Sequence, residues 1–342
     1  MKQAISLVKR IALIMILLSP FFLPKESYGN NENLFERPDS TGIKTEVTIG
    51  IYVVDIEYID NLKQNFTADF LLTAQWKDKR LSGEKRKINI EKIWSPNINI
   101  LNGRNLSTMY PENVDVDEDG NVMYRQRYYG NLTCLLDLKN FPFDDQVLPI
   151  SLVTLGYRPE QIELIFQDDN SGSAPRFSNS DWEIGKGVGS IGEYIASSSG
   201  KNSIEYILPA AHFKFEAKRH IFYYIWKVVL PLFIIVLMSW AIFYIDPTMV
   251  APQLGLAATS ILTLIAFLFS LGRILPPIAY LTKIDYFVYG SLSLVFLAFG
   301  EAVLTIHLGS NGKIENAKWM DRKARIIFPL AYLLILITFF IV

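Results

Sequence analysis

The sequence predicts an extracellular antiparallel β-sandwich followed by a four-helix transmembrane domain. Three observations support this prediction: a charged and apolar N-terminal segment, strand-like alternation that continues to Arg219, and four long apolar stretches after it. We therefore divide the 342 residues into a signal peptide at 1–29, a sandwich domain at 30–219 and a membrane domain at 220–342. Half of all residues are hydrophobic, and their clustering after Arg219 indicates a membrane protein.

The N-terminal segment has the three parts of a secretory signal. Lys2, Lys9 and Arg10 precede the apolar run at residues 11–24, and small or polar residues follow near Gly29. The alternative is a fifth membrane helix, but the run is shorter than the ~20 apolar residues that a membrane span requires. We expect cleavage near Gly29 and export of the domain that follows.

The sandwich domain reads as strands joined by turns. The stretches at 45–59 and 65–78 are rich in β-branched and aromatic residues, as strands are. Asp119-Gly120 precedes an alternating run, which is a strong hairpin signal, and residues 204–219 alternate again. No helical period separates these strands, so we expect an antiparallel sandwich.

The membrane domain consists of four apolar stretches, at residues 221–245, 251–272, 287–308 and 326–342. At ~1.5 Å rise per residue, the first three helices reach across a ~30 Å hydrocarbon core and the last is just long enough. An exported sandwich enters the membrane from outside, so the loop between the third and fourth helices lies inside. That loop carries five basic residues, in agreement with the positive-inside rule: Lys313, Lys318, Arg322, Lys323 and Arg325.

The second apolar stretch has one distinctive face. Steps of four and three residues select a stripe with a 3.5-residue repeat: Gly255, Thr259, Leu262, Ala266, Phe269 and Arg273. One interpretation is a packing seam between helices, because small residues and hydroxyls also serve membrane helix interfaces. The other is a pore lining, in which Leu262 and Phe269 form apolar rings that close the pore by dewetting. The stripe alone leaves both open.

Composition argues against several function classes. The net charge of −1 gives no reason to expect a nucleic-acid partner. The single cysteine, Cys134, excludes a disulfide framework within the chain and a cysteine-based zinc site. No nucleophile-and-base set, phosphate loop or His-rich cluster appears, so we expect no enzymatic activity, no cofactor and no metal.

A series of motifs extends along nearly the whole chain after the signal. Cys134 stands fourteen positions before Leu148, and the turn formed by residues 141–144 lies between them. The other motifs are Trp76-Lys77-Asp78-Lys79-Arg80-Leu81, Trp94-Ser95-Pro96, Asp119-Gly120, Arg219 just before the membrane, Pro231 in the first helix and Leu262 ahead of Pro276. In this order the chain resembles the pentameric ligand-gated ion channels, the Cys-loop receptor superfamily. Leu148 replaces the second cysteine, which resembles the prokaryotic branch, and the chain is most similar to its amine-gated members.

The resemblance implies a homopentamer around a central pore that the stripe lines. The expected partners are four identical subunits, permeant ions, membrane lipid and a small-molecule agonist. The expected location is the bacterial inner membrane, with a periplasmic or extracellular sandwich. The alternative from another class is a membrane-anchored sandwich that senses or binds a ligand without conducting.

The resemblance also implies agonist sites between subunits, built from aromatic rings. A ring face attracts an ammonium group by ~0.5–2 kcal/mol, so we expect a cationic amine. The motif order assigns Tyr157, Tyr194 and Tyr206 to this box, with ordinary sandwich packing as the alternative for each. Leu71 and Leu155 stand where family members often have rings, which makes the box less aromatic.

Two further expectations follow from the resemblance. The residues that couple agonist binding to gating are Phe141, Pro142, Phe143, Asp144, Arg219, Pro276, Tyr280 and Thr282, with Asp144 paired to Arg219. The permeant ion is a cation, because Asp246 and the acidic hairpin at Asp115, Asp117 and Asp119 concentrate cations along the pathway. Arg273 opposes that preference, and Ala251-Pro252-Gln253 at the inner mouth supplies no charge.

Overall fold

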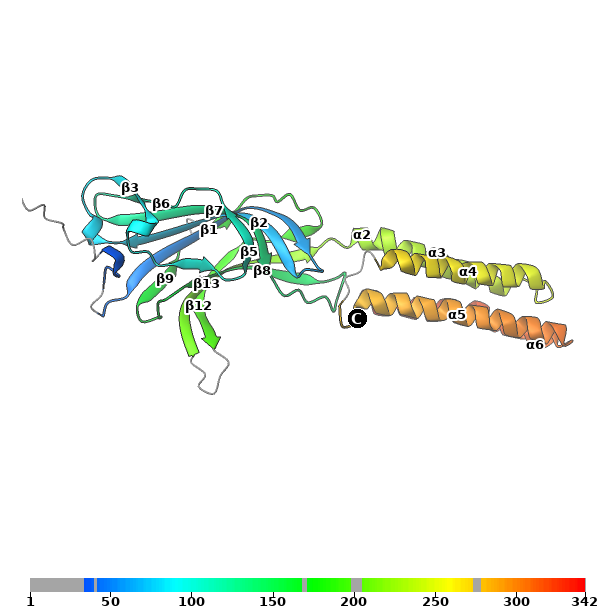
Figure 1. The fold of residues 1–342 in the computed structure, drawn as a ribbon. Helices are drawn as coiled ribbons and strands as arrows, with labels where there is room; N and C mark the ends of the chain where they lie inside the picture. Colours follow the sequence, from blue (N-terminus) through cyan, green and yellow to red (C-terminus); the bar gives the residue numbers. More distant parts are fainter. Residues whose placement is uncertain (1–33, 40–41, 168–170, 198–204, 273–277, 342) are drawn as a thin grey trace, which may run out of the picture.

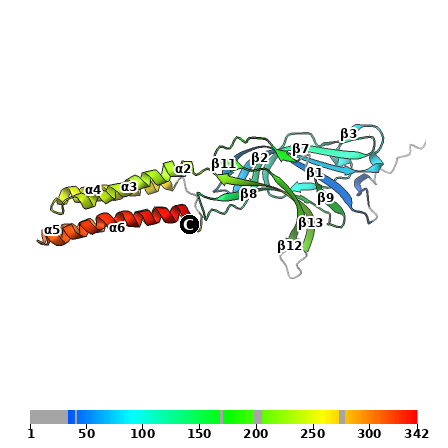
Figure 2. The ribbon, with the colours of Figure 1, turned by 180° about the vertical axis from the view of Figure 1, so that it is seen from behind.

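The computed structural model describes residues 34–39, 42–167, 171–197, 205–272 and 278–341. The predicted signal peptide, Arg273 and Pro276 lie outside the described residues. A sandwich of strands and a bundle of helices follow each other along one long axis (Figure 1). Seen from behind, the chain returns along α6 (Ile314–Ile341) toward the sandwich (Figure 2).

Two sheets form the sandwich. The larger consists of β1 (Thr45–Asp60), β2 (Asn65–Lys77), β3 (Arg86–Asn89), β5 (Gly103–Thr108), β6 (Asn113–Val116), β7 (Asn121–Thr133), β9 (Ile162–Phe166) and β10 (Gly172–Ser173). Its order is β10-β1-β2-β7-β6-β3, with β5 also on β7 and β9 also on β1. The smaller consists of β4 (Ile98–Ile100), β8 (Asp145–Thr154), β11 (Trp182–Ile184), β12 (Val188–Ser197) and β13 (Glu205–Arg219), in the order β11-β13-β8-β4 with β12 also on β13.

The pairing is antiparallel, as predicted, except at one edge. β9 and β10 both run parallel to β1. The chain crosses from the smaller sheet to the larger after β8, and a crossover of this kind brings it to the free edge of β1 in the same direction. Hairpin signals cannot predict such a crossover, because they report only strands joined by a tight turn.

The motif at residues 76–81, here called the tryptophan-aspartate motif, meets the Asp119-Gly120 hairpin at the end of β2 in the larger sheet. The Asp78 N–H donates to the Gly120 carbonyl at 2.8 Å, and the buried Asp78 carboxylate accepts from the Arg80 N–H at 3.0 Å. Gly120 has φ +78, and a Cβ on it would overlap the Asp78 carbonyl oxygen. Only glycine fits this turn, which is why the two motifs occur together.

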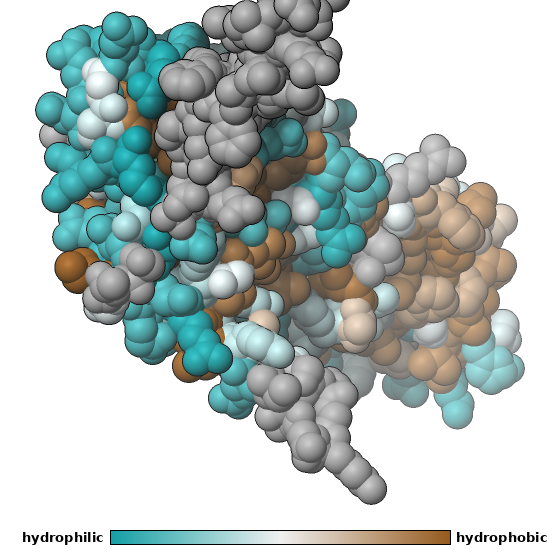
Figure 3. All heavy atoms as spheres, turned by 60° about the vertical axis from the view of Figure 1, so that its left-hand side comes forward, coloured by the Kyte–Doolittle hydropathy of each residue, from teal (hydrophilic) through white to brown (hydrophobic). Residues whose placement is uncertain are grey.

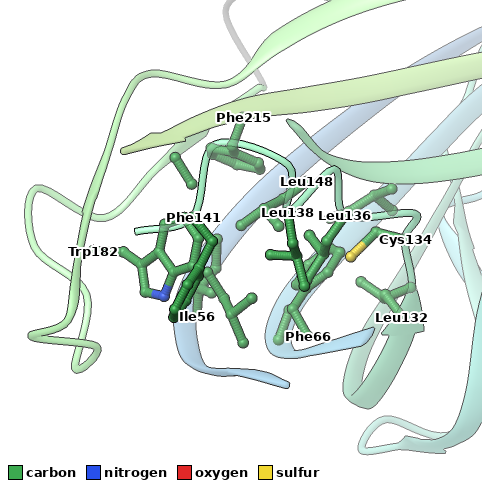
Figure 4. Close-up of a cluster of buried hydrophobic side chains, with 14 of the residues drawn as sticks. Ile56, Phe66, Leu132, Cys134, Leu136, Leu138, Phe141, Leu148, Trp182 and Phe215 are labelled. Atoms are coloured by element: carbon green, nitrogen blue, oxygen red, sulfur yellow. The ribbon is translucent and has the colours of Figure 1, made fainter. Parts of the chain in front are cut away.

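The core near the membrane end of the sandwich explains the unpaired cysteine (Figure 4). The Cys134 side chain is buried in a cluster that the loop between β7 and β8 shares with both sheets. Its buried members in this view include Ile56, Phe66, Leu132, Cys134, Leu136, Leu138, Phe141, Leu148, Trp182 and Phe215. Packing of Leu148 in this cluster, in place of a disulfide, holds the loop against the sandwich.

Among the described residues, the bundle has four helical spans that are long and apolar enough to cross a membrane. The first comprises α2 (Phe222–Tyr224), a π-helical turn at Ile225–Val229, α3 (Leu230–Ala241) and a 3₁₀ turn at Ile242–Tyr244. The others are α4 (Val250–Leu271), α5 (Lys283–Ser310) and α6. In a space-filling view the helices are mostly hydrophobic, whereas the sandwich surface is mixed and largely hydrophilic (Figure 3).

The fourth span begins earlier than the sequence predicts. The apolar stretch starts at residue 326, but α6 begins at Ile314 and includes most of the predicted basic loop. Half of residues 314–325 are Lys, Arg or Ala, which favour helix, so hydropathy located the apolar part and missed the polar first turns.

Burial predicts an unreactive thiol. It raises the pKa of Cys134 to about 12, so the native protein holds almost no thiolate at neutral pH. We expect a maleimide to label the unfolded protein fully and the native protein only slowly. The control is Leu135→Cys in a Cys134→Ala background, because the neighbouring Leu135 side chain is 95% exposed. Equal labelling rates in the two native proteins would show that the cluster does not protect Cys134.

Candidate functional site

Arg219, the last residue of β13, is the centre of a buried polar contact between the sandwich and the first span. Its Nε donates to Asp144 Oδ1 at 2.8 Å and its Nη2 to Asp144 Oδ2 at 2.9 Å, so the two side chains form a bidentate pair. Nη2 also donates to Asn61 Oδ1 at 3.0 Å. Both charged side chains are buried, and Gln146 Nε2 donates a further bond to Asp144 at 2.7 Å.

Aromatic rings enclose the same guanidinium. Its carbon lies 4.0 Å from the Trp182 ring centre and 4.8 Å from that of Phe141. Phe141 in turn packs edge-on against Tyr224 of α2, with 4.8 Å between ring centres. Because burial and the ring faces add to two charge-assisted hydrogen bonds, Arg219 joins the loop, β11 and α2 into one contact.

The loop between β7 and β8 also covers the N-terminus of α5. The Lys283 N–H donates to the Lys139 carbonyl at 3.1 Å and the Ile284 N–H to the Phe141 carbonyl at 3.2 Å. These are amides of the first helical turn, which have no partner within the helix. The Tyr280 hydroxyl accepts from the Leu138 N–H at 3.1 Å, so the segment before α5 is held as well.

Thr282 begins α5 with a capping box. Its backbone N–H donates to Asp285 Oδ2 at 2.8 Å, and its hydroxyl accepts from the Asp285 N–H at 3.4 Å. Thr282 is buried, and its capping box stabilises the first turn of α5, which the loop contacts.

The tip of the loop reaches the last helix too. The Phe143 ring packs against Phe339 and Phe340 of α6, with ring centres 5.1 and 5.9 Å apart. Pro142 lies between Phe141 and Phe143 and is buried, and its peptide bond with Phe141 is cis. The eleven-residue loop 134–144 therefore contacts the first, third and fourth spans at once, and any displacement of the loop acts on all of them.

Helix α4 leaves the predicted stripe uncovered within one chain. Gly255, Thr259, Leu262, Ala266 and Phe269 are all exposed, and the Leu262 and Phe269 side chains are 69% and 79% exposed. The opposite face is buried against the rest of the bundle, through Gln253, Ala257, Ser260, Leu264 and Leu271. The packing seam within the chain is thus the other face of the helix.

Two of the three predicted agonist tyrosines lie on the hairpin formed by β12 and β13, which projects from the sandwich (Figure 1). Tyr194 pairs with Leu208 and Tyr206 with Ala196, so the two rings occupy one face on a diagonal. Tyr206 is 52% exposed and Tyr194 somewhat less. The tip of the hairpin, residues 198–204, lies outside the described residues.

Tyr157 has a different environment. It lies on the loop after β8, where its hydroxyl accepts from Trp94 Nε1 at 2.8 Å and its ring meets Trp94 edge-on at 5.8 Å. Trp94 also packs against Trp76 of the tryptophan-aspartate motif. Tyr157 is therefore tied to the core of the sandwich, and its ring is less available than those of the hairpin.

Sequence reasoning missed three contributors to the Arg219 contact. Asn61 follows β1 in an ordinary turn, Trp182 begins a three-residue strand and Tyr224 lies in an apolar helix. None of the three stands in a recognisable motif, and only the fold brings them to one guanidinium. Within the described ranges, no group of three or more metal-ligating side chains is gathered.

Comparison with known proteins agrees with this architecture. Residues 28–221 match the neurotransmitter-gated ion-channel ligand binding domain. The chain is 27% identical to γ-aminobutyric acid receptor subunit rho-3 of Rattus norvegicus over 306 residues, covering 85% of this chain and 64% of that protein. It is 26% identical to the Homo sapiens rho-3 subunit over 304 residues, with 85% and 63% covered. It is 25% identical to the Gallus gallus beta-4 subunit over 285 residues, with 78% and 56% covered.

The chain spans a little under two thirds of the length of these first relatives. The family match covers more than half of the chain, and the sandwich followed by four apolar helices is the architecture that the motif order predicts. The chain therefore belongs to the neurotransmitter-gated ion-channel family, within the superfamily of pentameric ligand-gated channels.

Proposed function

We propose that this chain is the subunit of a homopentameric channel that opens when a small molecule binds between the sandwiches of neighbouring subunits. The observation that supports it best is the stripe on α4, whose apolar residues stay exposed while the opposite face packs on the bundle. Five copies around an axis would place these exposed side chains, Phe269 among them, on one shared inner surface.

In the proposed pentamer, rings of Leu262 and Phe269 close the pathway at rest. Hydrated ions do not cross apolar collars unless these widen. The hydroxyls of Thr259 and Thr263 donate to carbonyls one turn earlier at 2.8 Å, so they add polar surface to the helix without an unpaired donor. Movement of the loop against α2, α5 and α6 would be carried to α4 by the bundle.

The agonist we propose is a small cationic amine, held by the hairpin rings of Tyr194 and Tyr206. Both are exposed on one face, which suits a cap that closes over a ligand from a neighbouring subunit. Tyr157 supports that site from the core through Trp94. The relatives' name makes γ-aminobutyrate, an amine with a carboxylate, the first compound to test.

We further propose that the pathway prefers cations, with the structure supporting this choice only at the inner end. Hydrogen bonds from Thr248 lower the pKa of Asp246, which therefore stays charged. Lys318 lies 3.4 Å from it and compensates part of that charge. Asp115 is likewise shared between Lys87 and Arg125. A reversal potential that follows sodium or potassium supports the preference, and one that follows chloride overturns it.

Leu148 in place of a second cysteine supports a bacterial inner membrane as the location, with the sandwich outside. Planar-bilayer recording of the purified protein tests the function itself. We expect discrete currents that depend on a compound from a panel of γ-aminobutyrate and primary amines. Binding without current, measured on the same preparation, would favour the alternative of a non-conducting sensor.

The first channel prediction concerns the pair between Asp144 and Arg219. Asp144→Asn keeps the shape of the side chain but leaves the Arg219 charge without its counter-ion, which in a buried pair costs about 3–5 kcal/mol. We expect pentamers of lower thermal stability whose agonist response is strongly reduced. Asp137→Asn on the same loop is the control, because that carboxylate is exposed. Unchanged dose–response curves for Asp144→Asn would remove the pair from gating.

The second channel prediction concerns the exposed stripe on α4. Single cysteines at Gly255, Thr259, Leu262, Ala266 and Phe269 should react with aqueous thiol reagents in the open channel. Leu264→Cys, on the buried face, should not react. The native Cys134 gives little background because it is buried. Leu262→Ser should also produce standing current without agonist, since a hydroxyl ring is easier to wet. Faster labelling at Leu264 than at Leu262 would reverse the orientation of α4.

The third channel prediction concerns the hairpin formed by β12 and β13. Tyr206→Ala should weaken agonist potency about tenfold, which corresponds to about 1.4 kcal/mol from one ring. Unitary conductance should stay the same, because the residue is far from the helices. Ile207→Ala is the matched control, since successive residues of a strand point to opposite faces. An equal loss of potency in both variants would indicate damage to the hairpin rather than loss of a binding ring.

A further inference from the structure

Two acidic side chains meet inside the bundle, near the end remote from the sandwich. Glu301 lies on α5 and Asp321 on α6, and their carboxyl groups are within hydrogen-bonding reach of each other. Asp321 is only 1% exposed. All four carboxylate oxygens are buried, and none has a hydrogen-bond donor among the described residues.

The pore helix contributes a further buried acceptor beside this pair. Gln253 of α4 is fully buried, and its Nε2 donates to Thr305 Oγ1 at 3.3 Å. Thr305 lies one turn beyond Glu301 on α5 and donates to the Glu301 carbonyl at 3.1 Å. Gln253 Oε1 lacks a donor in the described part of the chain. Helices α4, α5 and α6 therefore contribute buried oxygen acceptors that have no hydrogen-bond donor in the described part of the chain.

Nearby charges do not neutralise the pair. Arg325 attracts Asp321 from one turn further along α6, but its Nε donates to the Phe243 carbonyl at 2.9 Å and its guanidinium lies 4.6 Å from the Tyr244 ring centre. Asp246, on the loop before α4, repels Asp321 and is itself paired with Lys318. From α4, the neutral amide of Gln253 reaches Thr305, one turn from Glu301.

We propose that Glu301 and Asp321 bind one proton between them, forming an internal acid pair that fastens α5 to α6 beside the pore helix. Two carboxylates cannot donate to each other, and two buried charges of one sign repel. One proton turns one carboxyl into a donor, satisfies an oxygen of the other and leaves a single charge near Arg325. When the proton leaves, the hydrogen bond is replaced by repulsion, so alkaline pH should loosen this end of the bundle.

Infrared spectroscopy of the full chain in liposomes tests proton binding directly. Near neutral pH we expect a carbonyl stretch of a protonated carboxyl group, which both Glu301→Gln and Asp321→Asn lose. Glu315→Gln is the control, because Glu315 is an exposed acid at the start of α6 and its replacement should leave the band in place. The band should fade in the wild type as the pH is raised, because loss of the shared proton removes the protonated carbonyl group.

Thermal unfolding supplies a second readout. Between about pH 6 and about pH 9 the wild-type Tm should fall, and Glu301→Gln should lose most of that fall because an amide donates permanently to Asp321. If the single variants do not fold, Glu301→Leu combined with Asp321→Leu removes both charges and should behave likewise. Retention of the band and of the full Tm shift in the folded variants would overturn the shared proton. Both readouts are independent of conduction, so a protein that carries no current still tests the pair.

Discussion

The buried pair between Arg219 and Asp144 fixes how the sandwich meets the first helix of the bundle. An arginine so close to the membrane would be costly to bury alone, and its neighbours can be understood as the groups that stabilise it. Asp144 supplies the charge, Asn61 a further acceptor, and the rings of Trp182 and Phe141 a surface. Because these groups come from three segments, namely the loop between β7 and β8, the turn after β1 and the start of β11, the guanidinium holds the three in one arrangement. The first span begins within three residues of Arg219, so its direction is set by the same contact.

The loop between β7 and β8 is rigid without a disulfide for related reasons. Its apolar side chains join the core, and two glutamines hold its backbone. Gln64 Oε1 accepts from the Leu136 N–H at 2.7 Å, and Gln146 both donates to and accepts from Asp137. A loop packed in this way moves as a body, because a close-packed interface shifts between discrete arrangements rather than deforming. Its carbonyls and rings seat on α5 and α6, which links the ends of the sandwich and the bundle mechanically.

The bundle shows two different uses of polar groups in an apolar setting. On the exposed stripe of α4, hydroxyls are satisfied by carbonyls of the same helix, so the surface can meet either water or another subunit. Between α4, α5 and α6, in contrast, the side-chain oxygens of Gln253, Glu301 and Asp321 include buried acceptors that lack donors in the described structure. The first arrangement suits a face that changes its environment, and the second makes the interior sensitive to proton binding. The stripe runs along the length of α4. The acid pair lies beside α4, near its end away from the sandwich.

Residue order and periodicity were enough to predict a sandwich, four spans and the Asp119-Gly120 hairpin, and the family resemblance added the pairing of Asp144 with Arg219. Period, length and turn chemistry are local properties, and the ordered motifs locate residues that occupy equivalent places in the family. Tertiary structure alone decided the parallel strands β9 and β10, the groups around Arg219, the anchoring of Tyr157 to Trp94 and the meeting of Glu301 with Asp321. Each of these joins residues on elements far apart in the chain. Hydropathy reads Glu301 and Asp321 as two isolated charges, and only the packing of α5 on α6 brings their carboxyl groups together.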